Sequence, residues 1–251
     1  MYAGDMKDRI QNNRLTLQDV SLSFGTMPVI QNISLTVNSG EFAVIVGPSG
    51  CGKTTILNLL SGHIQPDSGV IRREGVIRTV YQKDGLFPWL TVSQNISMGL
   101  RSVGDAQQRE EELQSLFDLI HLEDFKNHYP HELSGGMRQR VELARALAGN
   151  SDILLMDEPF SALDYQTRLR MRYELVRLLE NRPRTVIFVT HDIEEAAQLA
   201  DRVLVLSKRP ATILKELEIT AAKPRGLTDS EVIKAMKEIL EELGILREIV
   251  V

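Results

Sequence analysis

A glycine-rich loop with a lysine, set between an apolar run and a helical pattern, constrains the fold of this chain most strongly. The apolar run at residues 42–46 is continuous, which is typical of a strand buried on both faces of a sheet. Residues 54–60 predict a helix that ends at Gly62. A strand, a glycine loop and a helix in this order are the context of a phosphate-binding loop, so the sequence predicts a parallel α/β sheet that carries one.

The loop between this strand and this helix has the chemistry that a nucleotide triphosphate requires. Its glycines let backbone N–H groups approach phosphate oxygens, and the helix adds its positive end. Lys53 brings a charge to the β- and γ-phosphates, and the Thr54 hydroxyl can bind Mg²⁺. Every fixed position of the motif matches, which disfavours a glycine-rich turn with an incidental lysine. The candidate nucleotide-binding residues are Gly47, Pro48, Ser49, Gly50, Cys51, Gly52, Lys53, Thr54 and Thr55.

An acidic pair ends a second apolar run. Residues 153–156 predict a buried strand, and Asp157 and Glu158 follow it. A carboxylate at such a strand end is costly to bury unless it is paired or bound to a cation, so Asp157 is a candidate for a Mg²⁺ contact through water. Glu158 is the candidate for polarising the attacking water. Without the glycine loop, a solvated loop would be the better interpretation.

Two polar residues follow further predicted strands. Gln82 follows residues 76–81 and can offer an amide oxygen to Mg²⁺ or orient a water. His191 follows residues 186–190, and its neutral imidazole can hydrogen-bond the γ-phosphate and hold the attacking water in line. Either residue on its own would be interpreted as a polar strand cap.

A second candidate anion site precedes the helix predicted for residues 137–147. Ser134, Gly135 and Gly136 place a hydroxyl and free N–H groups at a positive helix end, although an ordinary N-cap has the same features. One chain cannot easily use both phosphate sites on one ATP. A head-to-tail pair of chains can, with each ATP held between Lys53 of one copy and Ser134 of the other.

The order of these motifs resembles the ATP-binding cassette (ABC) ATPases, and the resemblance covers nearly the whole chain. It implies an α/β fold: a P-loop NTPase (RecA-like) parallel-sheet core with an antiparallel β subdomain and an inserted α-helical subdomain. It also implies ATP and Mg²⁺ as ligands, a homodimer that closes on ATP, Gln82 as the glutamine loop and His191 as the switch histidine. By the same resemblance Asp164 contacts the twin chain, and Phe24 stacks on adenine unless it belongs to the core.

Residues 82–92 narrow the resemblance. Apolar side chains, Phe87 and Trp89 among them, crowd into a predicted surface loop, which suggests a docking site. The sequence of this segment is similar to that of the ATP-binding subunits of importers for nitrate, sulfonates and taurine, in which the region binds a membrane subunit. The resemblance implies membrane subunits and an extracytoplasmic solute-binding protein as partners, and a peripheral place on the cytoplasmic face of the cell membrane. Leu90 and Val92 are expected to fold back into the helical subdomain.

Three alternatives are weighed against this interpretation. A soluble ABC ATPase that is not coupled to transport, as in iron–sulfur cluster assembly, would not need the apolar docking segment. A nucleic-acid-linked ABC protein usually has two cassettes or a long coiled-coil insertion; this chain, of net charge −5, has neither and lacks a basic tract. A non-catalytic adaptor would not need both Glu158 and His191.

Composition and patterning fit one domain. No apolar run in the 251 residues approaches the ~20 residues that cross a bilayer, and a single cysteine excludes an internal disulfide. The expected parts are a flexible tail at residues 1–13, a nucleotide-binding core with an antiparallel β layer at 14–82 and 152–222, a helical subdomain at 83–151, and a C-terminal helix at 223–251.

Local patterns predict the elements at the two ends of the domain. Short β-type runs at residues 15–17, 20–24 and 33–37 predict the antiparallel layer. The stretch between Gly62 and Gln82 is shorter than is usual in the family that the sequence resembles, so this layer is expected to be smaller than usual. Thr228 and Glu231 predict a capping box for the last helix. Its predicted apolar face comprises Ile233, Met236, Leu240 and Leu243.

Overall fold

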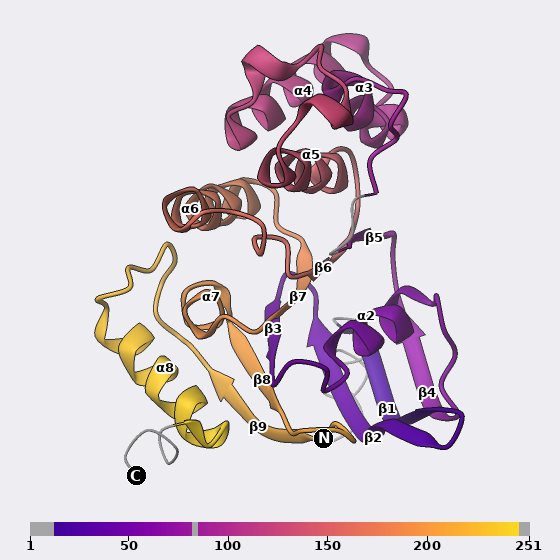
Figure 1. Cartoon of the computed structure of the whole chain (residues 1–251), viewed down its shortest axis with the longest axis vertical. Coiled ribbons are helices and arrows are strands. Elements are labelled where there is room, and N and C mark those ends of the chain that lie inside the picture. Colours follow the sequence, from indigo (N-terminus) through magenta and orange to yellow (C-terminus); the bar gives the residue numbers. More distant parts are fainter. Residues whose placement is uncertain (1–12, 82–84, 246–251) are drawn as a thin grey trace, which may run out of the picture. The chain divides into compact units, whose positions relative to one another are not determined.

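The computed structural model describes residues 13–81 and 85–245, which form two compact units. Unit 1 comprises the described residues up to Gly75 and those from Pro183 onward, and unit 2 comprises Val76–Arg182. Figure 1 shows the helices and strands of both units.

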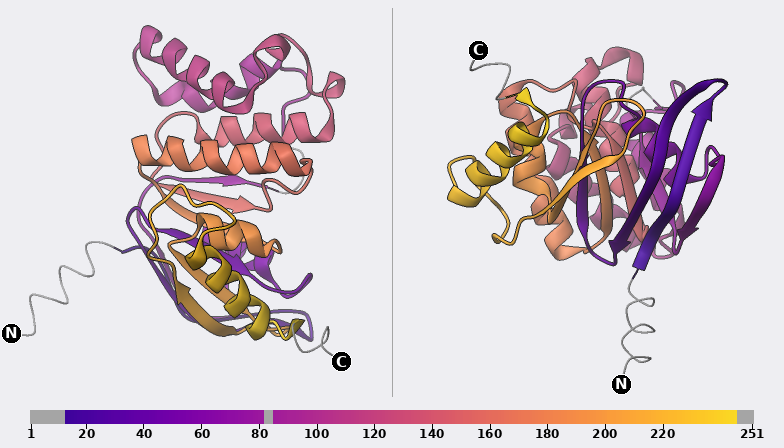
Figure 2. Two further views of the ribbon diagram at one scale, coloured as in Figure 1. Left: turned by 90° about the vertical axis from the view of Figure 1, so that its left-hand side faces the viewer. Right: turned by 90° about the horizontal axis from the view of Figure 1, so that it is seen from below.

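Unit 1 is built on a sheet of mainly parallel strands. Its strands follow one another in the order β7 (Thr185–Thr190), β3 (Phe42–Val46), β8 (Arg202–Leu206) and β9 (Ile213–Glu218). β3 pairs in parallel with β7 and β8, and β9 is antiparallel to β8. Every residue of β3 and β7 is buried, which explains their continuous apolar runs. Among the residues described, the helices of this unit are α2 (Lys53–Ser61), α7 (Ile193–Leu199) and α8 (Ser230–Glu242), of which α8 packs against α7 and β9 (Figure 2).

A second sheet in unit 1 is antiparallel. It has the order β2 (Met27–Asn38), β1 (Asn13–Phe24) and β4 (Ser68–Arg73). β1 is one strand over both predicted runs, and the pairing register shifts around Asp19, whose φ is +51°. β4 was not predicted because most of its side chains are exposed and it is defined by its pairing with β1. The predicted antiparallel layer therefore exists, with longer strands than the sequence indicated.

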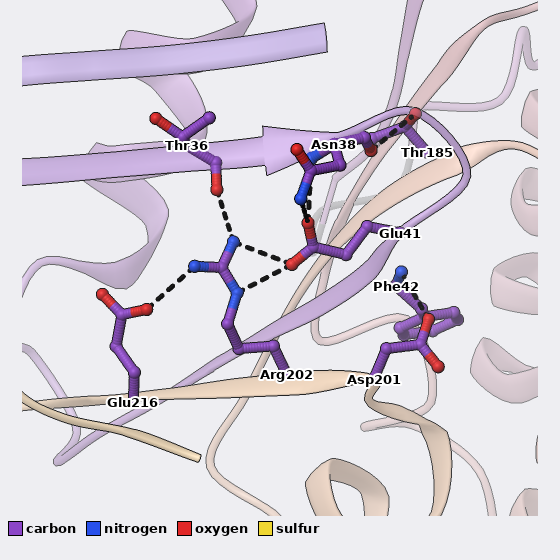
Figure 3. Close-up of polar contacts among 8 residues, drawn as sticks. All are labelled: Thr36, Asn38, Glu41, Phe42, Thr185, Asp201, Arg202 and Glu216. Carbon is purple, nitrogen blue, oxygen red and sulfur yellow. Dashed lines mark hydrogen bonds and ion pairs between the residues drawn. The ribbon is translucent and has the colours of Figure 1, made fainter. Parts of the chain in front are cut away.

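A half-buried arginine, Arg202, connects the two sheets of unit 1 (Figure 3). The Arg202 guanidinium on β8 bonds Glu41 at 2.7 Å and Glu216 on β9 at 2.8 Å, and it donates to the Thr36 carbonyl on β2. Burial alone would lower the pKa of Arg202, but the two carboxylates outweigh it and the pKa is raised. Arg202 is therefore charged and joins the antiparallel sheet to the sheet that carries the phosphate-binding loop.

Unit 2 combines two parallel strands with helices. Its elements are β5 (Ile77–Val80), α3 (Val92–Ser97), α4 (Ala106–Ile120), α5 (Gly135–Leu147), β6 (Ile153–Asp157), α6 (Tyr165–Asn181) and 3₁₀ turns at Gly99–Ser102, Glu123–Phe125 and Pro130–Glu132. β5 pairs with β6, and α5 contacts β5, α3 and α4. Buried Glu112 on α4 accepts from the Gly149 N–H at 2.7 Å and pairs with Arg182 at 3.0 Å. The strands predicted around residues 76–81 and 153–156 and the helix at 137–147 are thus present.

The prediction for the last helix is wrong in two respects. α8 has Asp229 at its N-cap without a side-chain cap, so Thr228 forms no capping box with Glu231. The reason is that the Asp229 carboxylate closes a turn by accepting from the Gly226 N–H at 2.7 Å. The buried face is also displaced: it consists of Val232, Ala235 and Ile239, while Ile233 is 53% exposed.

Candidate functional site

The phosphate-binding loop closes around the ammonium of Lys53. Lys53 begins α2, is only 6% exposed, and its Nζ donates to the carbonyls of Gly47 at 2.8 Å and Pro48 at 3.1 Å. Gly52 has φ +125°, and a Cβ there would lie 2.9 Å from Ile30 Cδ1, so a side chain is excluded. The loop therefore holds a buried cation on weak carbonyl acceptors that phosphate oxygens can replace.

The polar face of this loop lies at the start of α2. Ser49, Gly50 and Thr54 are exposed, and Thr55 is half-buried. The Thr54 hydroxyl stands on the first turn of the helix, where the helix dipole favours an anion and the metal ion that accompanies it.

His191 belongs to the same edge of the sheet as the loop. Val46 at the end of β3 pairs with Thr190 at the end of β7, so the residues that follow each strand leave the sheet at one edge. Asp192 caps α7 by accepting from the Glu194 N–H at 2.9 Å, and its own N–H donates to the Thr190 hydroxyl at 2.9 Å. These bonds fix the backbone on both sides of the exposed imidazole.

Phe24 lies outside the core of unit 1. It ends β1, pairs with Met27 across the β1–β2 turn, and is 52% exposed. An exposed aromatic side chain at a strand end is available for stacking on a base, which favours the adenine role over the core role.

The acidic pair lies in unit 2, at the end of β6. Asp157 is 3% exposed, and Glu158 is half-buried with a φ of +47°. The Glu158 carbonyl accepts from the Ser161 hydroxyl at 2.9 Å and from the Ser161 N–H at 3.1 Å. Gln82, the third candidate in this part of the chain, lies outside the described residues.

The second candidate anion site is also in unit 2, at the start of α5. Ser134 is the N-cap, and its hydroxyl accepts from the Met137 N–H at 3.3 Å. Ser134 and Gly135 are exposed, whereas Gly136 is half-buried and a Cβ there would lie 3.1 Å from the Ala162 carbonyl. An exposed, glycine-rich N-terminus on a helix of 13 residues is suited to an anion from another molecule.

Asp164 caps the neighbouring helix of unit 2. Its carboxylate accepts from the Thr167 N–H at 3.0 Å at the start of α6. That hydrogen bond lowers the pKa of Asp164, so the exposed side chain is anionic at neutral pH. This cap is its structural role, and its contact with a twin chain stays a prediction.

The proposed docking residues form a small aromatic group in unit 2. Trp89 is 69% exposed, and its ring centroid lies 5.5 Å from that of Phe87. The Arg145 guanidinium covers Phe87 at 5.5 Å and borders a cleft of about 310 Å³ that Glu142 also lines. Val92 is fully buried, as expected, and Leu90 is half-buried, whereas Trp89 is largely exposed. A contact between Trp89 and a partner stays a prediction.

Comparisons with known proteins identify the family of this chain. A sequence profile described as ABC transporter matches residues 30–161. The chain belongs to the ABC transporter family. It is 42% identical over 235 residues to the aliphatic sulfonates import ATP-binding protein of Rhodococcus jostii, covering 91% of this chain and 93% of the relative. It is 44% identical over 204 residues to the nitrate import ATP-binding protein of Synechocystis, covering 78% and 77%.

A solved ABC cassette has the same fold. Its structure, a dimeric post-hydrolysis state of an ATP-binding cassette bound to ADP and Pi, superposes with a TM-score of 0.74 at 31% identity and covers 83% of this chain and 100% of that one. The predicted fold class and the resemblance to importer ATP-binding subunits are thereby confirmed. Within residues 13–81 and 85–245, no helix of this ABC cassette has the length and apolar character needed to cross a membrane.

Arg209 contacts the phosphate-binding loop of this cassette and was not predicted from the sequence. Arg209 follows β8, and its Nε donates to the Gly50 carbonyl at 3.1 Å. The available signal was the position of Arg209 just after a buried strand, because parallel neighbours such as β8 and β3 end at the same edge of a sheet. The motif itself contains no arginine, so pattern matching could not find this contact.

Cys51 gives a direct chemical probe of the loop. The thiol is 2% exposed, and burial raises its pKa, although the nearby Lys53 charge opposes this effect. Because the thiolate is the reactive form, we expect slow alkylation by iodoacetamide at pH 7 and faster alkylation as the pH rises. Mass spectrometry of this sole cysteine measures the rate. ATP with Mg²⁺ should slow alkylation further, and the alkylated protein should not bind ATP; equal rates with and without ATP would contradict this.

Proposed function

We propose that this chain hydrolyses ATP to power the import of a small solute, of the nitrate, sulfonate or taurine type or a related organic compound. The observation that carries the proposal is the buried ammonium of Lys53, held by two carbonyls of its own glycine loop. Such an arrangement favours the β- and γ-phosphates of ATP because anionic oxygens are stronger acceptors than carbonyls. The relatives named as import ATP-binding proteins support the coupling to transport.

The residues fit Mg²⁺ as the companion of ATP. Mg²⁺ prefers oxygen ligands and keeps several waters, so one or two protein groups and the phosphates complete its shell. Thr54 has an exposed hydroxyl at the start of α2 that would bind the ion, and Asp157 has a carboxylate at the end of β6 that would hold one of its waters. Gln82 adds an amide oxygen. When bound, the ion neutralises charge on the phosphates.

Hydrolysis requires a water aligned with the γ-phosphate, and two side chains are assigned to it. Glu158 accepts hydrogen bonds from this water and polarises it. His191 donates to the γ-phosphate and holds the water in line. Phe24 stacks on the adenine, and the loop residues from Gly47 to Thr55 bind the phosphates.

The working form in this proposal is a head-to-tail homodimer. The exposed N-terminus of α5, with Ser134, Gly135 and Gly136, binds the γ-phosphate of the ATP held by the partner chain. Asp164 contacts the partner near the same place. Loss of the γ-phosphate removes this link, so hydrolysis opens the dimer and converts chemistry into movement. The dimeric state of the solved cassette supports this arrangement.

The chain is placed at the cytoplasmic face of the cell membrane by its partners. Phe87 and Trp89 dock a membrane subunit, which in turn receives solute from an extracytoplasmic solute-binding protein. The high exposure of Trp89 supports this assignment, since aromatic side chains are enriched among the central contacts of interfaces. Arg145, which covers the Phe87 ring, also lines a cleft, so the surface next to Phe87 is hollowed.

Co-purification tests the coupling to a membrane partner. The Glu158→Gln variant, purified with ATP and Mg²⁺ from gently solubilised membranes of its own cell, should bring a polytopic membrane protein in stoichiometric amount. Adding Trp89→Ala should remove that partner, because a central aromatic contact contributes about 2 kcal/mol or more, roughly thirtyfold in Kd.

The matched control is Tyr173→Ala, which removes another exposed aromatic side chain of unit 2. Nucleotide binding by each purified variant shows that it has folded. An ATP-bound homodimer without any membrane protein would instead support the alternative, a soluble ABC ATPase that is not coupled to transport.

A further inference from the structure

A buried glutamine on α5 binds the segment that carries Glu158. Gln139 is 7% exposed, and its Nε2 donates to the Glu158 carbonyl at 3.0 Å and to the Ser161 hydroxyl at 3.3 Å. Its Oε1 accepts from the Ala162 N–H at 2.9 Å. One side-chain amide thus satisfies its donor and acceptor on a single stretch of five residues, 158–162.

That stretch needs an external support. Glu158 has a φ of +47°, a left-handed conformation that residues with a side chain seldom adopt. Such a conformation persists where the surroundings hold it in place. The Gln139 amide, which comes from helix α5, supplies such support by a hydrogen bond to the main-chain carbonyl of Glu158. The carboxylate of the same residue is proposed to polarise water.

The same helix touches the segment at a second point. Gly136 lies one turn before Gln139, and a Cβ at Gly136 would come within 3.1 Å of the Ala162 carbonyl. The first turn of α5 therefore packs directly on the backbone beyond Glu158. Ser134, the N-cap of α5, is proposed above to bind the γ-phosphate of the ATP held by the partner chain.

We propose that Gln139 is a positioning residue that sets the orientation of the Glu158 backbone and links it to the N-terminus of α5. The proposal rests on the proposed function and deepens it. A phosphate that binds at Ser134 shifts or orders α5, and Gln139 transmits this to the Glu158 of the same chain. Each ATP site would then report its occupancy to the other through an intrachain amide, without a contact between Gln139 and either nucleotide.

The test replaces the amide and measures kcat and nucleotide affinity separately. Gln139→Met keeps the volume and removes all three hydrogen bonds, and Gln139→Glu keeps only the acceptor for the Ala162 N–H. Both variants should lower kcat by about tenfold to a hundredfold, since a small misplacement of a reacting group has effects of this size. The Kd for ATP of the monomer should stay within about twofold, because the Lys53 loop is unchanged.

A double variant separates positioning from general damage. If Gln139 acts through Glu158, then Gln139→Met should leave the residual rate of Glu158→Gln unchanged. A variant that only lost folded protein would lower both rates equally and would lower the unfolding temperature to match. Gln114→Leu is the matched control, because it removes an exposed amide of α4 that bonds Asp118 at 3.1 Å.

The outcomes are distinct. Wild-type kcat in both Gln139 variants, or equal losses with and without Glu158, would overturn the positioning role. Loss of ATP affinity with kcat retained would also overturn it. If the wild-type chain hydrolyses no ATP, or Glu158→Gln has no effect, the proposed function itself fails, and this result is obtained before any Gln139 variant is compared.

Discussion

Replacing Glu158 with glutamine is expected to lower ATP turnover by about a hundredfold to ten-thousandfold while ATP binding persists. The change is isosteric and removes only the charge that polarises water. The backbone of Glu158 keeps its bonds to Gln139 and Ser161, because these involve its carbonyl and not its side chain. Phosphate release under saturating ATP and Mg²⁺ measures the turnover, and binding of a fluorescent ATP analogue measures the affinity.

The same variant should accumulate as a dimer. With hydrolysis blocked, the γ-phosphate continues to join Lys53 of one chain to Ser134 of the other, so size-exclusion chromatography with ATP and Mg²⁺ should show twice the monomer mass. Glu110→Gln removes an exposed charge on α4 and serves as the control, which should turn over ATP normally. A monomer at saturating ATP would refute the clamp, and unchanged turnover would refute the role of Glu158.

The sequence predicted the parts of the fold that bury their strands. β3, β6 and β7 are buried along their whole length, so each leaves an uninterrupted apolar run, and the glycine loop, Asp157 and His191 mark where these runs end. The helix that follows the phosphate-binding loop was equally visible, because Gly62 ends α2 in a left-handed conformation at φ +81°. These signals are local, and the candidate site residues were predicted from them.

The sequence did not predict features that depend on distant partners. β4 and β9 are largely exposed, and each is defined as a strand by pairing with another strand. Arg202 and Gln139 are polar residues in ordinary contexts, and only the fold shows that one joins two sheets and the other holds the Glu158 segment. Periodicity also failed for α8, where the burial stripe is shifted by one residue from the predicted one.

Replacing Lys53 with alanine is expected to weaken ATP binding by about a hundredfold or more. A hydrogen bond to a charged group contributes about 1.5–3 kcal/mol, and Lys53 can make one to each of the two terminal phosphates. The loss should be larger for ATP than for adenosine, because adenosine lacks the phosphates and depends on Phe24. Isothermal titration calorimetry of both ligands measures this difference directly.

The replacement also removes a buried side chain, so its structural effect has to be separated from the loss of charge. Lys53 occupies the centre of the loop, where its Nζ satisfies the Gly47 and Pro48 carbonyls. Lys53→Met fills the same space without the ammonium and should weaken ATP binding as strongly as Lys53→Ala. Lys208→Ala removes an exposed cation beyond β8 and should leave the Kd within about twofold, since an exposed charge contributes little. If Lys53→Met bound ATP as tightly as the wild type does, the role of this lysine would be packing and not charge. The buried ammonium of Lys53 would then no longer support ATP binding as the proposed function.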